Sequence, residues 1–310
     1  MDLHPWDIWT PAGAPQPWTP EIVQRLEAVL ARAPNHPLAN HLYIHAVEAS
    51  PAPGRADAAA QRLRTLQPGL AHMLHMPSHI DVRRGRWEEA ITANTRALEA
   101  DRRYQERRPR QGFYRMYMAH NHHMLAFAAM MTGQSEVALR AIREMVAPLT
   151  ADVVRERPFL DGLLAMPFEV LLRFGKWEEV LSEPEPPLPL SRTLWRYARG
   201  VARAARGELR EARAEQAAFA VARKAIAADD AFGNNSAEAI VAVAEHVLAG
   251  EILLKEGAVA AAVEELRRGV AAEDALRYDE PPDWIQPVRH ALGATLLHAG
   301  RAAEAEAVYR

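Results

Sequence analysis

The sequence predicts an all-helical protein. Long stretches rich in Ala, Leu, Arg and Glu repeat apolar residues with a helical period, and Gly or Pro interrupts them about every dozen residues. No stretch alternates apolar and polar residues with the two-residue period of a β-strand. With 310 residues, 49% of them hydrophobic, the chain is long enough to bury a sizeable core.

The expected helices come in pairs. Residues 1–19 form an N-terminal extended segment, and the next helix ends at the proline of ARAP (31–34). The following helices meet near GRADAA (54–59) and end at LQP (66–68). Later pairs share a glycine followed, five residues on, by Ala or Val, in GRWEEA (85–90), GQSEVA (133–138), GKWEEV (175–180), GELREA (207–212), GAVAAA (257–262) and GRAAEA (300–305). The glycine supplies a left-handed turn and the small residue lets the two helices pack closely.

These pairs resemble the tetratricopeptide repeat, a two-helix unit of about 34 residues. The resemblance runs from about Glu21 to the C-terminus and implies a right-handed superhelical solenoid of antiparallel helix pairs over residues 20–310. Because successive glycines are separated by 48, 42, 32, 50 and 43 residues, we expect about six to seven irregular repeats. We divide them into a His-rich N-terminal half (36–133) and C-terminal repeats (157–310).

The string HPLANHLYIHAVEASPAP…HMPSHIDVRRGRW is also similar to a group of His-rich bacterial tetratricopeptide proteins of unassigned function. Chains in that group are longer and carry further repeats before the segment that here begins PWDIWT. The last helix, which ends AEAEAVYR, fits a portion of a longer solenoid.

Composition narrows the classes of function. A net charge of −3, from 37 basic and 40 acidic residues, argues against a nucleic-acid partner. The absence of Cys excludes thiolate metal sites and cysteine nucleophiles. The sequence contains no nucleotide-binding glycine loop, so we expect no nucleotide cofactor. It shows neither a signal peptide nor an 18-residue apolar run, so we expect no membrane contact and a cytoplasmic location.

Nine of the 13 histidines lie between His36 and His123. In tetratricopeptide arrays, residues thirteen, ten and six positions before the inter-helix glycine line the concave groove. Counting back from the glycines, this register selects His72, His75, His79, His120, His123 and His290. His122 falls between the groove positions and should face the partner helix. Counting instead from Pro34 places His41, His45 and Glu48 in the groove.

Neighbouring first helices of a solenoid lie roughly 10 Å apart, so these imidazoles can converge. Pairs four residues apart suit shared coordination of one ion. We therefore predict a metal site with the ligand pool His41, His45, Glu48, His72, His75, His79, His120 and His123. The competing interpretation is a polar groove that binds a peptide or an acidic ligand.

Without thiolates, copper is favoured, iron is next and zinc is possible. Six or more histidines suggest two copper ions with three imidazoles each, whereas Glu48 and Glu169 would suit iron with mixed ligands. Met73 and Met76 lie among the histidines, and their helix face favours core packing over copper binding.

Two segments are candidates for substrate contacts. The connection 101–117 is rich in Arg and Tyr and could form an anion-binding lid, although a solvated loop is the simpler interpretation. YDEPPDW (278–284) could line the rim of the groove. The predicted substrate-binding residues are Glu169, Arg115, Tyr117, Tyr278, Glu280, Trp284, Arg289 and His290.

These patterns favour a metal-dependent oxidoreductase that acts on a small molecule or peptide in the concave groove. The alternatives are a non-catalytic tetratricopeptide module that binds a peptide or protein, and metal storage without turnover. The sequence sets no oligomeric state.

Overall fold

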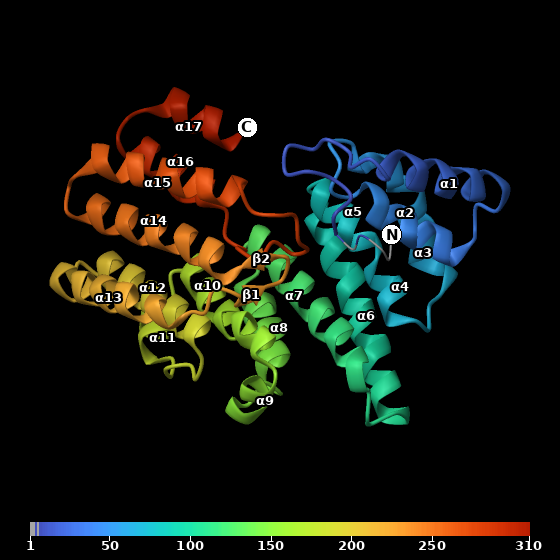
Figure 1. Ribbon diagram of the computed structural model, residues 1–310, viewed down its shortest axis with the longest axis horizontal. Helices are drawn as coiled ribbons and strands as arrows, with labels where there is room; N and C mark the ends of the chain where they lie inside the picture. The colour runs from blue at the N-terminus through green and yellow to red at the C-terminus, as the bar shows by residue number, and fades with distance from the viewer. Residues whose placement is uncertain (1–3, 5) are drawn as a thin grey trace. The chain divides into compact units, whose positions relative to one another are not determined.

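The chain is all-helical, as predicted (Figure 1). The computed structural model describes His4 and residues 6–310; residues 1–3 and 5 of the predicted N-terminal segment lie outside the described part. The helices form two compact units, each described by itself below. The first contains the chain up to Met145 together with Tyr278–Pro281, and the second contains Val146–Arg277 and Pro282–Arg310.

The first unit begins with a non-helical segment that makes one isolated bridge between Trp9 and Pro15. Its helices are α1 (Thr19–Arg32), α2 (Pro37–Val47), α3 (Asp57–Leu66), α4 (Ala71–His75), α5 (Pro77–Arg83), α6 (Trp87–Arg107), α7 (Arg115–Met131) and α8 (Ser135–Val146), the last of which runs one residue into the second unit. Short 3-10 turns occur at Pro53–Ala56 and Gly112–Tyr114. As the prolines predict, α1 and α3 end before Pro34 and Pro68.

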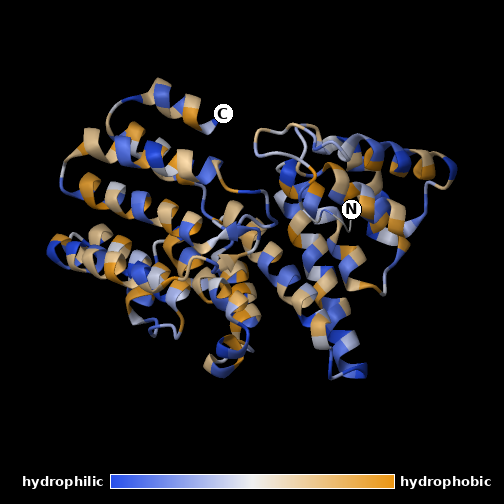
Figure 2. Cartoon of the chain, viewed as in Figure 1, coloured by the Kyte–Doolittle hydropathy of each residue, from blue (hydrophilic) through white to orange (hydrophobic). Residues whose placement is uncertain are grey.

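Apolar faces of α2, α3 and α5 form the core of the first unit. Ile44, Leu63, Met76 and Ile80 are fully buried there, and Met73 is partly buried against this cluster. The prediction that both methionines pack in the core is therefore confirmed. Figure 2 shows hydrophilic and hydrophobic residues on most helices, as expected when one face of each is buried.

The second unit is built mainly from consecutive helix pairs. Its elements are α9 (Ala151–Glu156), a 3-10 segment at Pro158–Ala165, α10 (Met166–Arg173), α11 (Trp177–Ser182), α12 (Pro189–Ala205), α13 (Leu209–Ala222), a 3-10 turn at Arg223–Ala225, strands β1 (Ala231–Phe232) and β2 (Asn235–Ser236), α14 (Ala237–Lys255), α15 (Val259–Asp274), α16 (Val288–His298) and α17 (Ala302–Tyr309). The two strands pair antiparallel. Helix α10 packs on α11, α12 on α13, α14 on α15 and α16 on α17, and contacts of α12 with α14 and of α15 with α16 join the pairs.

The six predicted turn glycines all adopt the left-handed backbone conformation. Their φ angles lie between 64° and 82°, at Gly85, Gly133, Gly175, Gly207, Gly257 and Gly300. A side chain is strained in this region, so glycine suits a tight turn between two helices. Gly54 of GRADAA, near which another helix pair was expected to meet, lies in a 3-10 turn.

The segment 101–117 is not a long loop. Helix α6 continues to Arg107, and α7 begins at Arg115, so only a short connection remains between them. Arg, Glu and Gln have good helix propensity, so the charged run extends the helix until Pro109 ends it.

Two helix contacts of the second unit require glycine, because a larger residue would clash with the neighbouring helix. A Cβ added at Gly250 of α14 would lie 2.7 Å from Cγ of Leu266 on α15. A Cβ at Gly200 of α12 would lie 2.6 Å from Cδ1 of Leu248 on α14. Both distances are shorter than carbon atoms tolerate, so these glycines set how closely the helices pack.

We expect Gly250→Ala to lower the free energy of unfolding by about 1–3 kcal/mol, because overpacking exceeds the gain in helix propensity. Urea denaturation measures the change. Gly69→Ala is the matched control, since a Cβ there meets no described atom within 4 Å. Equal stability of the two variants would contradict this account of the α14–α15 contact.

Candidate metal centre

Three groups of side chains in the first unit can each hold a metal ion. The groups are His41, His45 and His72; His75, His79 and His120; and His45, Glu48, His79 and Glu280. Within each group, one potential ligand atom per residue lies within 4.8 Å of the others. The first two groups share no residue, whereas the third takes one histidine from each of them. We call the first two the outer and inner histidine sets.

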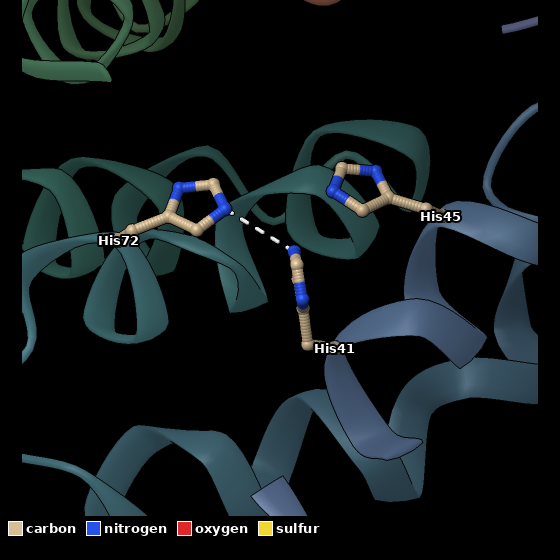
Figure 3. Close-up of side chains that lie close together, drawn as sticks. All are labelled: His41, His45 and His72. Carbon is tan, nitrogen blue, oxygen red and sulfur yellow. Dashed lines mark hydrogen bonds between the residues drawn. The ribbon is translucent and has the colours of Figure 1, made fainter. Parts of the chain in front are cut away.

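The outer set joins α2 to α4. His41 and His45 lie one turn apart on α2, so their rings point from the same helix face toward His72 on α4 (Figure 3). The Nε2 atoms of His41 and His72 are 3.2 Å apart. Their Nδ1 atoms are buried and have no hydrogen-bond partner among the described residues. The imidazoles therefore meet through the nitrogens that face each other across the gap between the two helices.

The inner set joins α4, α5 and α7. His75 and His79 are almost fully buried, and their Nε2 atoms are 2.6 Å apart. The ring of His120 on α7 lies 4.5 Å from that of His75 and 5.6 Å from that of His79, measured between centroids. The two sets are neighbours, since the ring centroids of His45 and His79 are 5.0 Å apart.

Hydrogen bonds on the far side of each ring determine where the protons of the inner set lie. Asn94 donates through Nδ2 to the carbonyl of Ala90, so its Oδ1 faces His75 and accepts from Nδ1 at 2.6 Å. His79 Nδ1 donates to Glu48 Oε2 at 2.7 Å. A neutral imidazole carries one proton, so both Nε2 atoms are bare acceptors. Two lone pairs that face each other at 2.6 Å require a cation or a shared proton between them.

Two buried carboxylates lie behind His45 and His79. Glu48 accepts from His45 Nδ1 at 2.6 Å and from His79 Nδ1 at 2.7 Å, and Glu280 Oε2 is also 2.7 Å from His79 Nδ1. The hydroxyl of Tyr278 bonds to both carboxylates at 3.3 Å. Arg83 donates to the backbone carbonyl of Glu48. A carboxylate that accepts a hydrogen bond from the ring nitrogen that does not bind the metal typically orients the histidine ring for metal binding.

The two carboxyl groups share one negative charge. Burial raises the pKa of Glu48, but the charges of His79 and His45 and a hydrogen bond from Glu280 together hold it well below its ordinary value. Burial, followed by the charge of Glu48, raises the pKa of Glu280 well above its ordinary value. Glu280 therefore keeps its proton and hydrogen-bonds the Glu48 carboxylate.

Four imidazoles of the two sets have a lowered pKa, which favours their neutral form. Burial, followed by the charge of His45, lowers the pKa of His41 to about 3. Burial, followed by the charge of His75, lowers the pKa of His72 to about 2. The pKa values of His75 and His120 are also well below 6.5, first because of burial and then because of neighbouring imidazoles. Neutral imidazole is the form that binds a metal ion.

The residues present fit a metal ion. Crowded imidazoles offer unprotonated nitrogens, a buried carboxylate supplies negative charge, and the opposed Nε2 atoms of the inner set can be bridged by a cation as well as by a shared proton. Imidazole suits copper, iron, nickel and zinc.

Not every predicted ligand joins these groups. Among the described residues, His123 belongs to none of them; it is buried one turn after His120, its Nε2 is unpartnered, and burial lowers its pKa to about 4. Glu280, expected to contact substrate, instead lies among the possible metal ligands. Tyr278 lies behind the centre and bonds to its carboxylates.

The remaining predicted substrate residues are dispersed. In the first unit, Tyr117 packs against His72 with ring centroids 4.8 Å apart, and Arg115 is exposed beside Gln111. The other predicted substrate residues belong to the second unit and are Glu169, Trp284, Arg289 and His290.

In the second unit, packing and pairing account for these side chains. Glu169 accepts from the backbone N–H of Ile285, and burial raises its pKa to about 8. Trp284 was expected to line a rim, but it is 2% exposed because it packs in the core against Tyr197. Arg289 pairs with Asp274 and His290 bonds to Arg173.

Sequence reasoning missed two neighbours of the centre. Asn94 orients His75 from α6, and the Trp6 ring meets His45 edge-on at 5.2 Å. Neither of them occupies a repeated offset from a turn glycine, so the register that selected the histidines carries no signal for them.

Comparison with known proteins does not assign the chain to a family. No model of a known protein family matches the chain, and no curated protein matches it at a significant level. In the part of the chain that the structure describes, no helix combines the length and apolar character needed to cross a membrane.

The pKa shifts predict that the metal-free protein loses stability in acid. Below about pH 6.5 the unfolded chain protonates His41 and His72, whereas the folded chain does so only near pH 3 and pH 2. Between these limits the free energy of unfolding decreases as the pH is lowered, by up to about 1.4 kcal/mol per pH unit for each imidazole.

Urea denaturation of chelator-treated protein between pH 7 and pH 4.5 measures this slope. The double variant His41→Gln, His72→Gln should have a shallower slope because it lacks both groups. An unchanged slope would show that these imidazoles titrate normally in the folded chain.

Proposed function

We propose that the chain is a metal-dependent oxidoreductase whose outer and inner histidine sets each hold one ion. The observation that carries this proposal is the pair of bare Nε2 atoms of His75 and His79, 2.6 Å apart in a buried site. The neighbouring outer set offers a second group of three imidazoles. Three imidazoles for each of two ions is a ligand set for a dinuclear copper centre.

Copper is the favoured ion. The chain has no thiolate, and the affinity order of divalent first-row metals peaks at copper for nitrogen ligands. Iron is next, and zinc would instead activate water for hydrolysis. When bound, copper would supply one-electron redox chemistry, with dioxygen as the electron acceptor.

The residues around the sets would prepare this centre. Asn94 accepts from Nδ1 of His75, and Glu48 accepts from Nδ1 of His45 and His79, which leaves Nε2 of these three rings free for an ion. Burial lowers the pKa of His41, His72, His75 and His120 and so favours their neutral form. The Glu48 carboxylate would balance part of the positive charge of the ions.

A second candidate is a single iron ion in the mixed group. His45, Glu48, His79 and Glu280 bring two imidazoles and two carboxylates together, a ligand type that suits iron. In this case the carboxylates would bind the ion directly instead of orienting the histidines.

We further propose that the helix pairs form a right-handed solenoid of the tetratricopeptide type, and that a small molecule or peptide is the substrate. The left-handed glycines at the six turns and the packing of successive pairs in the second unit support this scaffold. A binding module without metal and a metal store without turnover are the competing functions.

Elemental analysis by mass spectrometry of untagged protein, after reconstitution with copper or iron, tests the metal centre. We expect about two copper ions per chain in the wild type, since each of the two sets offers the three imidazoles that can hold one ion. The variants His75→Ala, His79→Ala and His41→Ala, His72→Ala should each lose one ion.

The matched control is His246→Ala, His298→Ala, which removes two histidines from the second unit. Metal in neither the wild type nor the control would leave a peptide-binding scaffold. One iron that is lost in Glu48→Gln would favour the mixed group. Bound copper without oxygen consumption in the presence of phenolic or peptide reductants would favour storage.

A further inference from the structure

The outer histidine set is more accessible from solvent than the inner one. His41, His45 and His72 are all partly exposed, whereas His75 and His79 of the inner set are almost fully buried. A substrate that gives electrons to a metal ion has to approach that ion closely. The surface around the outer set is therefore the place where a substrate of the proposed enzyme would bind.

Two exposed aromatic rings border the outer set. Tyr117 lies one turn before His120 on α7, and its ring centroid is 4.8 Å from that of His72. Phe113, four residues earlier, meets Tyr117 edge-on, with centroids 6.1 Å apart and an angle of 82° between the ring planes. Tyr117 is 39% exposed and Phe113 is 78% exposed. We call these two rings, which stand nearly at right angles, the aromatic corner.

The aromatic corner is supported by the helices behind it. Tyr114 packs against Tyr117 with ring centroids 5.7 Å apart. Its hydroxyl donates to Asp101 Oδ1 at 3.2 Å, and Asn121 donates to Asp101 Oδ2 at 2.7 Å. Asp101 and Asn121 are both buried. These contacts hold the ring of Tyr117 in place while part of it stays exposed.

Helix α2 adds an exposed apolar side chain beside the same histidines. Leu38 precedes His41 by three residues and His45 by seven, so the three side chains share one face of the helix. Leu38 is 51% exposed. His41 in turn meets His72, the neighbour of the aromatic corner, through Nε2. Apolar and aromatic side chains around a few polar ligand atoms are typical of a small-molecule site.

The geometry of the aromatic corner favours a ring as its occupant. Aromatic rings prefer offset-stacked or edge-to-face contacts with centroids 4.5–7 Å apart. A guest ring could make one such contact with Tyr117 and another with Phe113. Phenols also fit the proposed chemistry, because the radical left after loss of one electron is delocalised over the ring.

We propose that Phe113 and Tyr117 bind the ring of a phenolic substrate, with its hydroxyl groups toward the ion held by the outer set. This inference rests on the proposed function and names its substrate class. For catechol the reaction balances with dioxygen as the oxidant. Two catechol molecules each lose two electrons and two protons to become quinones, and one dioxygen molecule takes up the four electrons and four protons to form two water molecules.

Binding is tested first, with the full chain loaded with zinc, which has no redox chemistry. Isothermal titration calorimetry measures the dissociation constant of catechol. We expect Tyr117→Leu and Phe113→Leu each to raise it roughly three- to tenfold, because an aromatic contact is lost. Tyr117→Phe keeps the ring and should bind as the wild type does. Phe159→Leu is the matched control, since Phe159 is 59% exposed and belongs to the second unit.

Turnover is tested next, with the copper-loaded chain and an oxygen electrode. Tyr117→Leu and Phe113→Leu should raise KM for catechol by the same factor and leave KM for ascorbate, a reductant without an aromatic ring, unchanged. Metal content and circular dichroism verify that each variant is loaded and folded. A loss of metal in Tyr117→Leu would show that Tyr117 supports His72 instead of binding substrate.

The outcomes separate the substrate site from the metal centre. Full metal content with equal catechol affinity in all variants would overturn the aromatic corner as the substrate site and leave the metal centre standing. An effect confined to Trp6→Leu would move the substrate ring to the side of His45, which Trp6 contacts, and would overturn the assignment too. Failure of the wild type to bind either metal would overturn both proposals.

Discussion

Two bare nitrogen atoms that face each other in a buried site organise the first unit. His75 and His79 donate hydrogen bonds through Nδ1 to Asn94 and Glu48, so their Nε2 lone pairs meet at 2.6 Å. Burial lowers the pKa of His75 well below its ordinary value, because a charged imidazole there would lose its hydration. A metal cation or a shared proton resolves this conflict, and the three imidazoles of the inner set favour the metal ion.

The surrounding helices serve this arrangement. His75 and His79 lie at the end of α4 and within α5, and their sequence neighbours Met76 and Ile80 are buried in the core with residues of α2 and α3. Glu48, just beyond the end of α2, reaches His45 and His79 together. The outer and inner sets are thus linked by one carboxylate, because Glu48 accepts from a histidine of each set. A displacement of Glu48 would therefore change the orientation of a ring in both sets.

The sequence predicted the helices and most of the histidine cluster. Turn glycines located the helix pairs because a left-handed turn has a local signal, and spacings of four residues placed His41 with His45 and His75 with His79. The full length of α6 was not predicted, because residues 101–117 were expected to form a long connection. The helix propensity of Arg, Glu and Gln instead extends α6 to Arg107. Glu280 was assigned to substrate contact because its approach to His79 depends on the packing of a segment far along the chain, and spacing in the sequence gives no signal for such a contact.

Anomalous X-ray diffraction at the copper edge, from crystals of the copper-loaded full chain, tests the central claim most directly. The account predicts two anomalous peaks, one among His41, His45 and His72 and one among His75, His79 and His120. A single peak between Glu48 and Glu280, or no peak near any of these histidines, would contradict it.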